Sequence, residues 1–415
     1  MVVTGNNRKS RVSIVSSGYL PVPDVLGGAV EALITMLLRE NEITPSFNFT
    51  VYSSYSSDAL STANKFKHAE FVFIKIPRII KIIDFCIYFL AKHVLQKRKL
   101  MSYRFIAQRL WYIRKIAQKL SQTDSDALIL ENHPTLFSVF KMYGNSQKYS
   151  GKVYYHLHNE VTNTFGCTEQ IRTVHKVLGV SNYIVTSLDS RLGGLKSTQK
   201  AVWRNCVDTK KFNPNNAETQ KSGKKWREKL EIGENELVIL FSGRLTEEKG
   251  ARPLLEAFIQ ANIPNARLVI AGAFFVNTDI VSPFEQSLRT LAKKAGDRII
   301  FTGFVNHDQM PGIYAMADLC CLPSLWDDPA PLSVIECLAS GRVLVTTNSG
   351  GIPEYASKDS AIILERDAEL VPNLIKTLNL LGSDQRSRIV KSTKARKAAE
   401  AYSESAFLNQ LKTLL

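Results

Sequence analysis

Two carboxylates, Asp328 and Glu336, lie in a stretch, residues 319–355, whose pattern places them beside a helix start. The apolar run 319–322 predicts a buried strand, and a short helix is expected at about 332–340. In a doubly wound parallel sheet, ligands bind outside the carboxyl ends of the strands, where the first N–H groups of a helix are open to an anion. Since carboxylates suit sugar hydroxyls better than phosphate, the stretch predicts a site for a phosphorylated sugar compound.

Two cations follow another expected strand, Val238–Phe241. Arg244 and Lys249 lie in the segment SGRLTEEKG, at the opening of a helix that continues through Phe258. Two cations with a glycine at the carboxyl end of a core strand are arranged to neutralise a diphosphate. Ordinary surface charge is the alternative, and the position after a core strand favours phosphate.

Two histidines stand at the end of the strand expected at Val153–His156, in the segment YYHLHNE. Strand alternation sends His156 and His158 to the same face of the sheet. His158 is nearer the carboxyl end and is the better candidate for contacting a ligand, with a structural histidine as the alternative. No third ligand at zinc spacing follows, so no metal site is expected there.

Asp124 and Asp126 form a DxD pattern that can hold a divalent metal in some enzymes. They directly precede the apolar run 127–130. A solvated turn before a strand explains both acids, and the metal interpretation is the less favoured of the two.

A Gly-Gly pair, Gly27 and Gly28, ends the loop between an expected strand at Val12–Ser16 and an amphipathic helix. Strand, glycine-rich loop and helix is the layout in which backbone N–H groups approach a pyrophosphate. The GxGxxG pattern is absent, however, and a turn that needs positive φ explains the glycines equally well.

Strands and helices alternate twice along the 415 residues, which predicts an α/β protein with two parallel sheets. The first half contains further expected strands at 49–53 and 127–131. The second half contains expected strands at 267–271, 298–301, 318–322 and 342–346. The segment AVWRNCVD, residues 201–208, looks like the crossing between domains. An amphipathic segment from about 386 to 415 is expected to return to the first domain.

Residues 75–120 are unusually basic, with twelve Lys and Arg against a single acid, Asp84. They supply +11 of the net charge of +15. The segment also contains IIKIIDFCIYFLAKHVL, which is too interrupted to span a bilayer but suits its interface. A helical pair that packs Ile106, Leu110, Ile113 and Ala117 on the sheet is the alternative, and both can hold. No nucleic-acid motif accompanies the charge, so no nucleic-acid partner is expected.

The remaining composition is that of a globular protein of a reducing compartment. The six cysteines show no CxxC spacing, and Cys320, Cys321 and Cys337 are expected to be buried free thiols. The polar start MVVTGNNRKSRV lacks an apolar signal region, and no long uncharged apolar run exists. A cytoplasmic protein, peripheral on the inner face of the cell membrane, is therefore expected.

Taken together, these motifs resemble the family-4 retaining glycosyltransferases of the GT-B fold, which have two facing Rossmann-like domains. The resemblance spans nearly the whole chain. Its carriers are SGRLTEEKG, the hinge NCVD, the turn at 303–305, DDPAPLSVIE with seven residues between its two acids, and the closing GGIPE. It implies an N-terminal acceptor domain at 1–204, a nucleotide-sugar domain at 205–395, and a C-terminal helix at 396–415 that packs towards the first domain.

The resemblance also implies roles for individual residues. Arg244 and Lys249 match the pair that binds the donor diphosphate and stabilises it as it leaves. Asp328 takes the place of the acid that contacts the donor sugar, and Glu336 that of the acid that holds the ribose. His158 resembles a histidine that reaches the sugar from the other domain. The other positions matched to the donor are Gly27, Gly28, Gly243, Phe304, Val305, Pro331, Leu332 and Ser333, and those matched to the acceptor are Tyr19, Asn159 and Glu160.

Three departures from the family pattern bear on the donor sugar. Asp328 replaces the usual Glu, and Ala330 and Pro331 stand where Phe and Gly are common. Pro331 has no N–H to offer a ligand. In the hinge, Cys206 replaces the usual Gly.

The activity implied is metal-independent, retaining transfer of a hexose-type sugar from a UDP-, dTDP- or GDP-sugar, with no separate cofactor. The acceptor expected is a lipid-linked saccharide of cell-surface polysaccharide synthesis, at an anionic membrane surface. A catalytically silent, membrane-associated partner of another glycosyltransferase is the alternative. A nucleotide-dependent oxidoreductase is disfavoured, because both GxGxxG and an acid about 20 residues later are missing.

Overall fold

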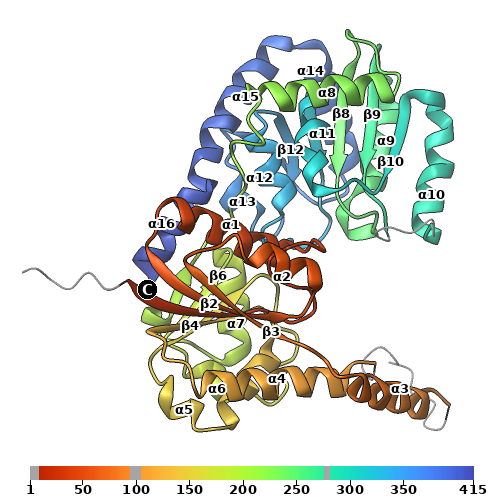
Figure 1. Ribbon diagram of the computed structural model, residues 1–415. Coiled ribbons are helices and arrows are strands. Elements are labelled where there is room, and N and C mark those ends of the chain that lie inside the picture. The colour runs from red at the N-terminus through yellow and green to blue at the C-terminus, as the bar shows by residue number, and fades with distance from the viewer. Residues whose placement is uncertain (1–8, 94–103, 275–280) are drawn as a thin grey trace, which may run out of the picture. The chain divides into compact units, whose positions relative to one another are not determined.

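A computed structural model describes residues 9–93, 104–274 and 281–415. The chain divides into two compact units (Figure 1). Unit 1 comprises residues 1–203 and 408–415, and unit 2 comprises 204–407. Each unit is an α/β fold built on its own parallel sheet, as the alternation of apolar runs predicts. The predicted fold class is confirmed.

Unit 1 contains a seven-stranded sheet in the order β3-β2-β1-β4-β5-β6-β7. All its strand pairs are parallel. Four of the strands were expected from apolar runs, and β3, β6 and β7 were not. The strands are β1 (Ser10–Val15), β2 (Phe47–Ser54), β3 (Ala69–Ile74), β4 (Ala127–Glu131), β5 (Val153–Leu157), β6 (Lys176–Gly179) and β7 (Lys200–Val202).

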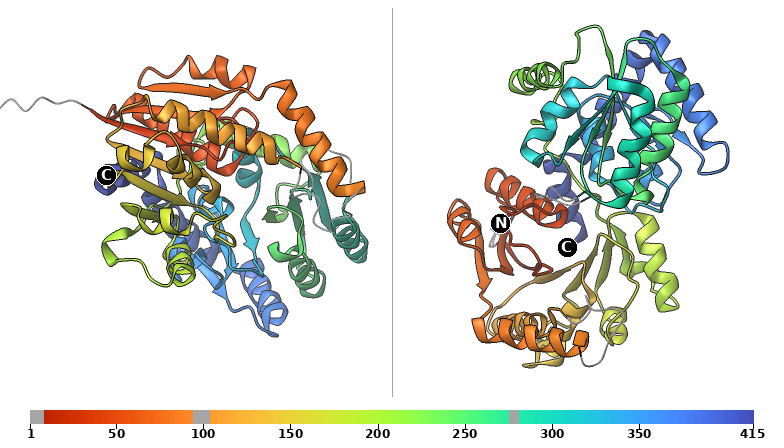
Figure 2. Two further views of the ribbon diagram at one scale, coloured as in Figure 1. Left: turned by 90° about the horizontal axis from the view of Figure 1, so that it is seen from below. Right: turned by 90° about the vertical axis from the view of Figure 1, so that its right-hand side faces the viewer.

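Helices connect these strands and cover the sheet (Figure 2). They are α1 (Ala29–Ile43), α2 (Ser57–Ala63), α3 (Arg78–His93), α4 (Ile106–Leu120), α5 (Asn145–Lys148), α6 (Thr168–Arg172) and α7 (Asn182–Leu192), and a 3₁₀ turn runs over Pro134–Lys141. Helix α4 packs through five buried residues, Tyr112, Ile113, Ile116, Ala117 and Leu120.

Helix α3 projects beyond the sheet of unit 1 (Figure 1), and only Asp84 and Ala91 of its residues are buried. The Asp84 carboxylate accepts the backbone N–H groups of Ala107 and Gln108, at 2.7 and 3.0 Å. One buried acid on α3 therefore caps the N-terminus of α4 and ties the two helices together.

Unit 2 contains a six-stranded parallel sheet in the order β10-β9-β8-β11-β12-β13. Five strands were expected, and β13 was not. The strands are β8 (Leu237–Ser242), β9 (Ala266–Ala271), β10 (Ile299–Gly303), β11 (Leu319–Leu322), β12 (Val343–Thr347) and β13 (Ala361–Leu364).

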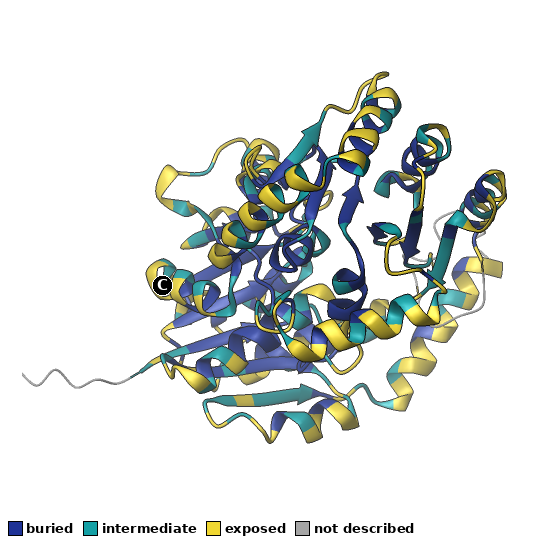
Figure 3. Cartoon of the chain, turned by 90° about the horizontal axis from the view of Figure 1, so that it is seen from above, coloured by how far each residue is buried: buried dark blue, intermediate teal, exposed yellow. Residues whose placement is uncertain are grey.

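The helices of unit 2 flank this sheet. They are α8 (Ala217–Lys229), α9 (Ala251–Ala261), α10 (Pro283–Ala292), α11 (Met310–Met316), α12 (Leu332–Ala339), α13 (Ile352–Tyr355), α14 (Leu370–Ser383) and α15 (Gln385–Ala399). Figure 3 shows buried strands, and helices that turn exposed faces outward. Of the cysteines, Cys86 is exposed and the other five are buried, and all six are free thiols.

In each sheet, the chain first adds strands on one side of its first strand and then adds the next strands on the other side. In unit 1 the chain runs from β1 outward to β2 and β3, then returns to β4 on the other side of β1. In unit 2 the same reversal separates β8 from β11. The loops that leave two neighbouring strands in opposite directions open a crevice at such a switch point, and ligands of open α/β sheets bind there.

The helix expected over residues 396–415 is broken. Helix α15 ends at Ala399, and α16 (Glu404–Leu414) starts after a turn at 400–402. Two side chains, those of Ser403 and Tyr402, account for the break. Ser403 Oγ accepts the backbone N–H of Ala406 at 3.3 Å, as a helix-start residue does, and the Tyr402 hydroxyl donates to two backbone carbonyls of unit 2. From Leu408 onward the chain is part of unit 1, where Lys176 Nζ donates to Leu414 O at 2.6 Å.

Candidate active site

The loops after β8 and β11 carry Arg244, Lys249 and Asp328, and they touch each other at the switch point. The backbone N–H of Leu325 donates to Glu248 O at 2.8 Å. At Gly250, φ is 76° and an added Cβ would lie 1.8 Å from Pro323 O. The glycine is required for this close approach, which brings Lys249 next to the loop after β11.

Lys249 and Asp328 form an ion pair across the switch point. Lys249 Nζ lies 2.5 Å from Asp328 Oδ2, and Asp328 is 5% exposed. The ammonium also lies 5.2 Å from the centre of the Trp326 ring, a cation–π contact. The sequence predicted both residues for the site, and the structure brings them together.

A second glycine fixes the loop that carries Asp328. At Gly350, φ is 50°, and an added Cβ would lie 2.5 Å from Asp328 O. The backbone N–H of Gly351 donates to the same carbonyl at 2.8 Å. The segment GGIPE thus holds the loop of Asp328 from the β12 side.

Arg244 follows β8 directly and is exposed. Its guanidinium makes no ion pair with any residue in the described ranges. Gly243, beside it, is half-buried, and its backbone N–H donates to Ala271 O at 3.1 Å. Arg244 therefore stands at the carboxyl edge of the sheet, where its guanidinium is accessible to a ligand.

The Glu336 carboxylate is buried and held by two side chains that sequence reasoning missed. His307 Nε2 lies 2.8 Å from Glu336 Oε1, and the Tyr314 hydroxyl donates to Oε2 at 3.0 Å. Burial raises the pKa of Tyr314 well above its usual value, so the phenol stays protonated and donates. These partners come from the segment between β10 and β11, and no spacing motif links them to Glu336.

The start of α12 lies between the two acids. Pro331 is the residue before the helix, and the first helical residues, Leu332 and Ser333, are half-buried. Pro331 O accepts the N–H of Val334 at 3.1 Å. Phe304 and Val305 follow β10 at the same edge, exposed and half-buried respectively. The predicted donor-binding residues of unit 2 thus lie in the loops after β8, β10 and β11 and in helix α12, which follows the β11 loop.

In unit 1, His158 is part of a buried cluster. Its Nε2 and the Nδ1 of His156 both donate to Glu131 Oε2, each at 3.0 Å. Although burial opposes ionisation, the two histidines lower the pKa of Glu131 to about 2, so it remains a carboxylate. Burial, followed by the charge on His156, lowers the pKa of His158 and favours the neutral ring. Trp203 lies against His156 with ring centres 4.3 Å apart.

The cluster corrects the expectation that the two histidines have no third metal-ligating residue beside them. Glu131 at the end of β4 supplies a third group beside the two histidines of the β5 end, and their ligand atoms all lie within 4.8 Å of one another. Sequence spacing could not show this, because Glu131 and His156 are paired across neighbouring strands. The N–O distances of 3.0 Å are those of direct hydrogen bonds, and His156 Nε2 is buried without a hydrogen-bond partner in the described ranges.

The DxD acids lie at the opposite end of β4 from this cluster. Arg11 forms ion pairs with Asp124 and Asp126 at 4.0 and 3.5 Å, and Lys148 lies 3.6 Å from Asp124. These exposed pairs support the interpretation as a charged turn.

Gly27 and Gly28 have positive φ, 80° and 101°, at the start of α1. An added Cβ on Gly28 would lie 2.3 Å from Glu31 Oε2. Glu31 is buried in the first turn of α1, and burial raises its pKa. The Glu31 carboxyl group therefore occupies part of the space through which a ligand would approach the backbone at Gly28.

The three residues predicted to contact the acceptor lie in loops of unit 1. Tyr19 follows β1 and is 62% exposed. Asn159 and Glu160 follow β5 and are exposed. Glu160 Oε1 accepts hydrogen bonds from the Tyr183 and Ser187 hydroxyls, so two residues of α7 hold the Glu160 side chain in place.

The described part of the basic segment contains the helices α3 and α4, whereas residues 94–103 lie outside the described ranges. The packing of these helices was only partly predicted. Ile113 and Ala117 are buried as expected, whereas Ile106 and Leu110 are exposed, Leu110 at 62%. The apolar side chains of α3 are exposed as well, at Ile79, Ile82, Ile83, Phe85, Phe89 and Leu90. None of the helices in the described ranges is both long and apolar enough to cross a membrane.

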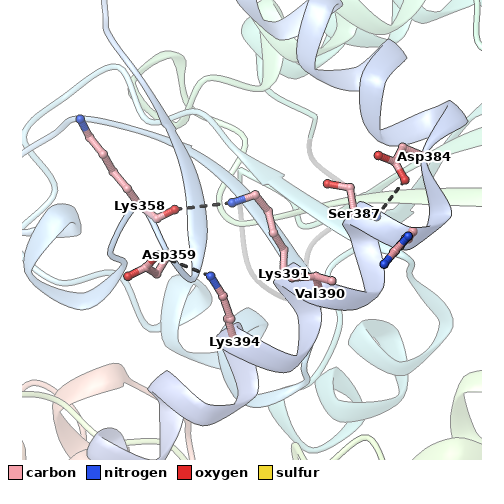
Figure 4. Close-up of a pocket in the computed structure, with 8 residues that line it drawn as sticks. Lys358, Asp359, Asp384, Ser387, Val390, Lys391 and Lys394 are labelled. Atoms are coloured by element: carbon pink, nitrogen blue, oxygen red, sulfur yellow. Dashed lines mark hydrogen bonds and ion pairs between the residues drawn. The ribbon is translucent and has the colours of Figure 1, made fainter.

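A surface hollow of unit 2 lies away from these loops, between the start of β13 and α15 (Figure 4). Lys394 pairs there with Asp359 at 3.6 Å, Lys391 Nζ donates to Lys358 O at 3.5 Å, and Asp384 accepts the N–H of Ser387. None of the predicted site residues lines it.

Comparison with known proteins shows which enzymes this chain resembles. Residues 222–397 match the family model of glycosyl transferases group 1. A putative glycosyltransferase of Bacillus subtilis strain 168 is 29% identical over 300 residues, which cover 70% of this chain and 72% of that protein. This chain is a glycosyltransferase with a group 1 domain at residues 222–397. A lipopolysaccharide 1,2-N-acetylglucosaminetransferase of Salmonella typhimurium is 24% identical to this glycosyltransferase, over 59% of this chain and 60% of that protein.

The fold of the glycosyltransferase is also found in solved structures. The Anabaena protein HepE, crystallised with UDP and glucose, has a TM-score of 0.69 and 16% sequence identity. The match covers 98% of this chain and 99% of that chain. At this identity the similarity shows the fold alone, which is the GT-B type.

Proposed function

We propose that this glycosyltransferase moves a hexose-type sugar from a nucleotide diphosphate to an acceptor hydroxyl with retention at the anomeric carbon. The observation that supports this most is the arrangement at the switch point of unit 2. There Arg244, Lys249 and the start of α12 offer positive charge to a diphosphate. Asp328 and Glu336 stand on either side of that helix start, where they suit the hydroxyls of the sugar and ribose.

The donor is a UDP-, dTDP- or GDP-sugar. The HepE structure carries UDP in a fold of the same type, which supports a nucleoside diphosphate here. Lys249 is shared between Asp328 and the incoming diphosphate. Because the carboxylate already holds the ammonium in place, little side-chain ordering remains to be done when the donor binds.

The leaving diphosphate is stabilised by protein charges. Arg244 and Lys249 supply two cations, and the N–H groups of Leu332 and Ser333 add their dipoles. We propose that these groups suffice without a metal ion. If activity disappears in EDTA and returns on addition of manganese, this part of the proposal is wrong.

Retention follows from a same-face substitution. The bond from the anomeric carbon to the diphosphate oxygen breaks while the acceptor oxygen attacks from the same side. The departing phosphate oxygen takes the proton of the acceptor hydroxyl, so the nucleoside diphosphate leaves protonated at that oxygen and no enzyme nucleophile is consumed. The reaction needs stabilisation of an oxocarbenium-like centre, and the Asp328 carboxylate is placed beside the diphosphate to contribute to it.

The acceptor is a saccharide linked to a lipid. The exposed apolar residues of α3, with the exposed cations Arg78, Lys81 and Lys92, form a surface suited to an anionic leaflet. We place this surface on the inner face of the cell membrane. The Salmonella relative is named for lipopolysaccharide, which supports a membrane-linked glycan as acceptor.

The test is incubation of the purified protein with a panel of UDP-, dTDP- and GDP-sugars in EDTA. Thermal stabilisation reports donor binding, and release of the nucleoside diphosphate reports turnover. We expect one base to be preferred and slow hydrolysis of its sugar nucleotide. Binding without any turnover, with or without acceptor, would favour a catalytically silent partner of another transferase.

A further inference from the structure

Arg109 of α4 is a half-buried cation that forms no ion pair with an acid of the described ranges. Its NH1 group donates to Ser17 O, and its Nε donates to Thr135 Oγ1 at 2.7 Å. Its NH2 group is buried and has no hydrogen-bond partner in the described chain. A guanidinium removed from water is costly unless all its donors are used, so an unused donor calls for a ligand or a role.

The position of Arg109 is that of a ligand site. Ser17 follows β1, and Thr135 follows β4, so the guanidinium bridges the two loops at the switch point of unit 1. This is the crevice in which open α/β sheets bind ligands. It is also the place where the acceptor residue Tyr19 is found.

A series of aromatic rings extends from the guanidinium. The Tyr19 ring centre lies 5.3 Å from Arg109 Cζ. His133 lies 5.7 Å from Tyr19 and stacks on Phe165 at 5.4 Å, measured between ring centres. Tyr19 and Phe165 are 62% and 53% exposed, so both rings have apolar surface available to a ligand.

His133 contributes a neutral ring to this set. Thr135 Oγ1 accepts from Arg109 Nε and donates its own hydrogen to His133 Nδ1, 2.8 Å away. Burial and the nearby Arg109 lower the pKa of His133 to about 4. The ring therefore carries its hydrogen on Nε2 and offers a face and a donor rather than a second charge.

We propose that the acceptor of this glycosyltransferase carries an anionic group, a phosphate or a carboxylate, that Arg109 binds at this switch point. A sugar ring of the acceptor lies against Tyr19, His133 and Phe165. Tyr19 covers the guanidinium in this structure, and the acceptor displaces its exposed ring to reach NH2. This inference rests on the proposed function and adds a charge requirement to the acceptor.

The test compares three acceptors that share one sugar and one short alkyl chain. The first is joined through a diphosphate, the second is an uncharged alkyl glycoside, and the third is an alkyl glucuronide. Binding is measured by calorimetry and transfer by product formation, both without membranes. We expect the wild-type protein to bind and use at least one anionic acceptor 10- to 100-fold better than the uncharged one, as charge-assisted hydrogen bonds allow. The diphosphate and glucuronide arms distinguish phosphate from carboxylate.

The Arg109→Gln variant is expected to lose this preference, and Arg114→Gln, at an exposed arginine of the same helix, is expected to keep it. Thermal unfolding checks that both variants fold. If wild type binds the charged and uncharged acceptors equally well, or binds none of the three while it binds a sugar nucleotide, the inference is wrong and the donor assignment stands. Failure to bind or hydrolyse any sugar nucleotide would instead refute the proposed function.

Discussion

At the scale of single residues, the partners of a charged side chain decide what it can do. Spacing along the chain predicted Lys249, Asp328 and Glu336 as site residues, because each follows a strand or opens a helix. It missed Glu131, His307 and Tyr314, which hold His158 and Glu336 in place. These contacts arise from the order of strands in a sheet, and no local pattern in one sequence records that order.

Glu336 provides a first prediction. Since its carboxylate is proposed to accept hydrogen bonds from the ribose, Glu336→Ala should weaken binding of the preferred sugar nucleotide at least tenfold. Isothermal titration calorimetry measures this. Glu365→Ala, at an exposed acid of the same unit, serves as the control, and equal affinities of the two variants would contradict the role.

Glu131 provides a second prediction, on stability. Its folded-state pKa of about 2 lies below the usual value of 4.5, so its contribution is present above about pH 4.5 and is lost as the pH falls towards 2. Glu131→Gln breaks a buried pair and should cost about 3–5 kcal/mol at neutral pH. Urea unfolding from pH 7 to 3 should show this difference shrinking below about pH 4.5. A difference that stays constant with pH would contradict the ionised cluster.

At the scale of elements, apolar runs predicted nine of the thirteen strands, and the four missed ones are short or lie near a sheet edge. In β3, for example, most residues are only half-buried, so the apolar signal is weak. The packing of α4 was mispredicted for the related reason that helical periodicity shows which residues share a face, but not where the neighbouring element ends. Leu110 shares its spacing with Ile113 and Ala117 and is nevertheless exposed.

A substitution at Gly250 tests whether the close approach to Pro323 O positions the loop after β8. Gly250→Ala should cost about 1–2 kcal/mol for the positive φ and about 1–3 kcal/mol more for the contact with Pro323 O. It should also lower donor affinity, because Lys249 is displaced. Gly296→Ala is a matched control, since φ is 64° there and nothing lies within 4 Å of the added Cβ. Denaturant unfolding measures the stability of both variants, and an equal loss in the two would refute the argument.

Helix α3 tests the membrane proposal. Replacing Phe85 and Phe89 by Ser should change stability by no more than about 0.5 kcal/mol each, because both side chains are exposed. The same change should reduce flotation with vesicles that contain anionic lipid. Leu380→Ser, at an exposed leucine of unit 2, should have no effect on flotation. If the wild-type protein binds neither anionic nor neutral vesicles, the docking surface is wrong.

At the scale of the whole molecule, the two sheets share one plan, with a switch point after the first strand of each. The sequence predicted two parallel α/β sheets, because alternating apolar runs and helical periodicities repeat in both halves, whereas the strand order that creates the switch points came from the structure. Each switch point gathers cations: Arg244 and Lys249 in unit 2, and Arg109 in unit 1. The predicted donor residues and the inferred acceptor site thus follow from the same feature of the fold.

The most direct measurement of the central claim is the release of nucleoside diphosphate from the preferred sugar nucleotide by wild type and Arg244→Ala, in EDTA. If fixed cations stabilise the leaving diphosphate, wild type turns over without metal and the variant is slower by about 100-fold or more. Equal rates for the two proteins, or no release by wild type until a divalent metal is added, would contradict the account.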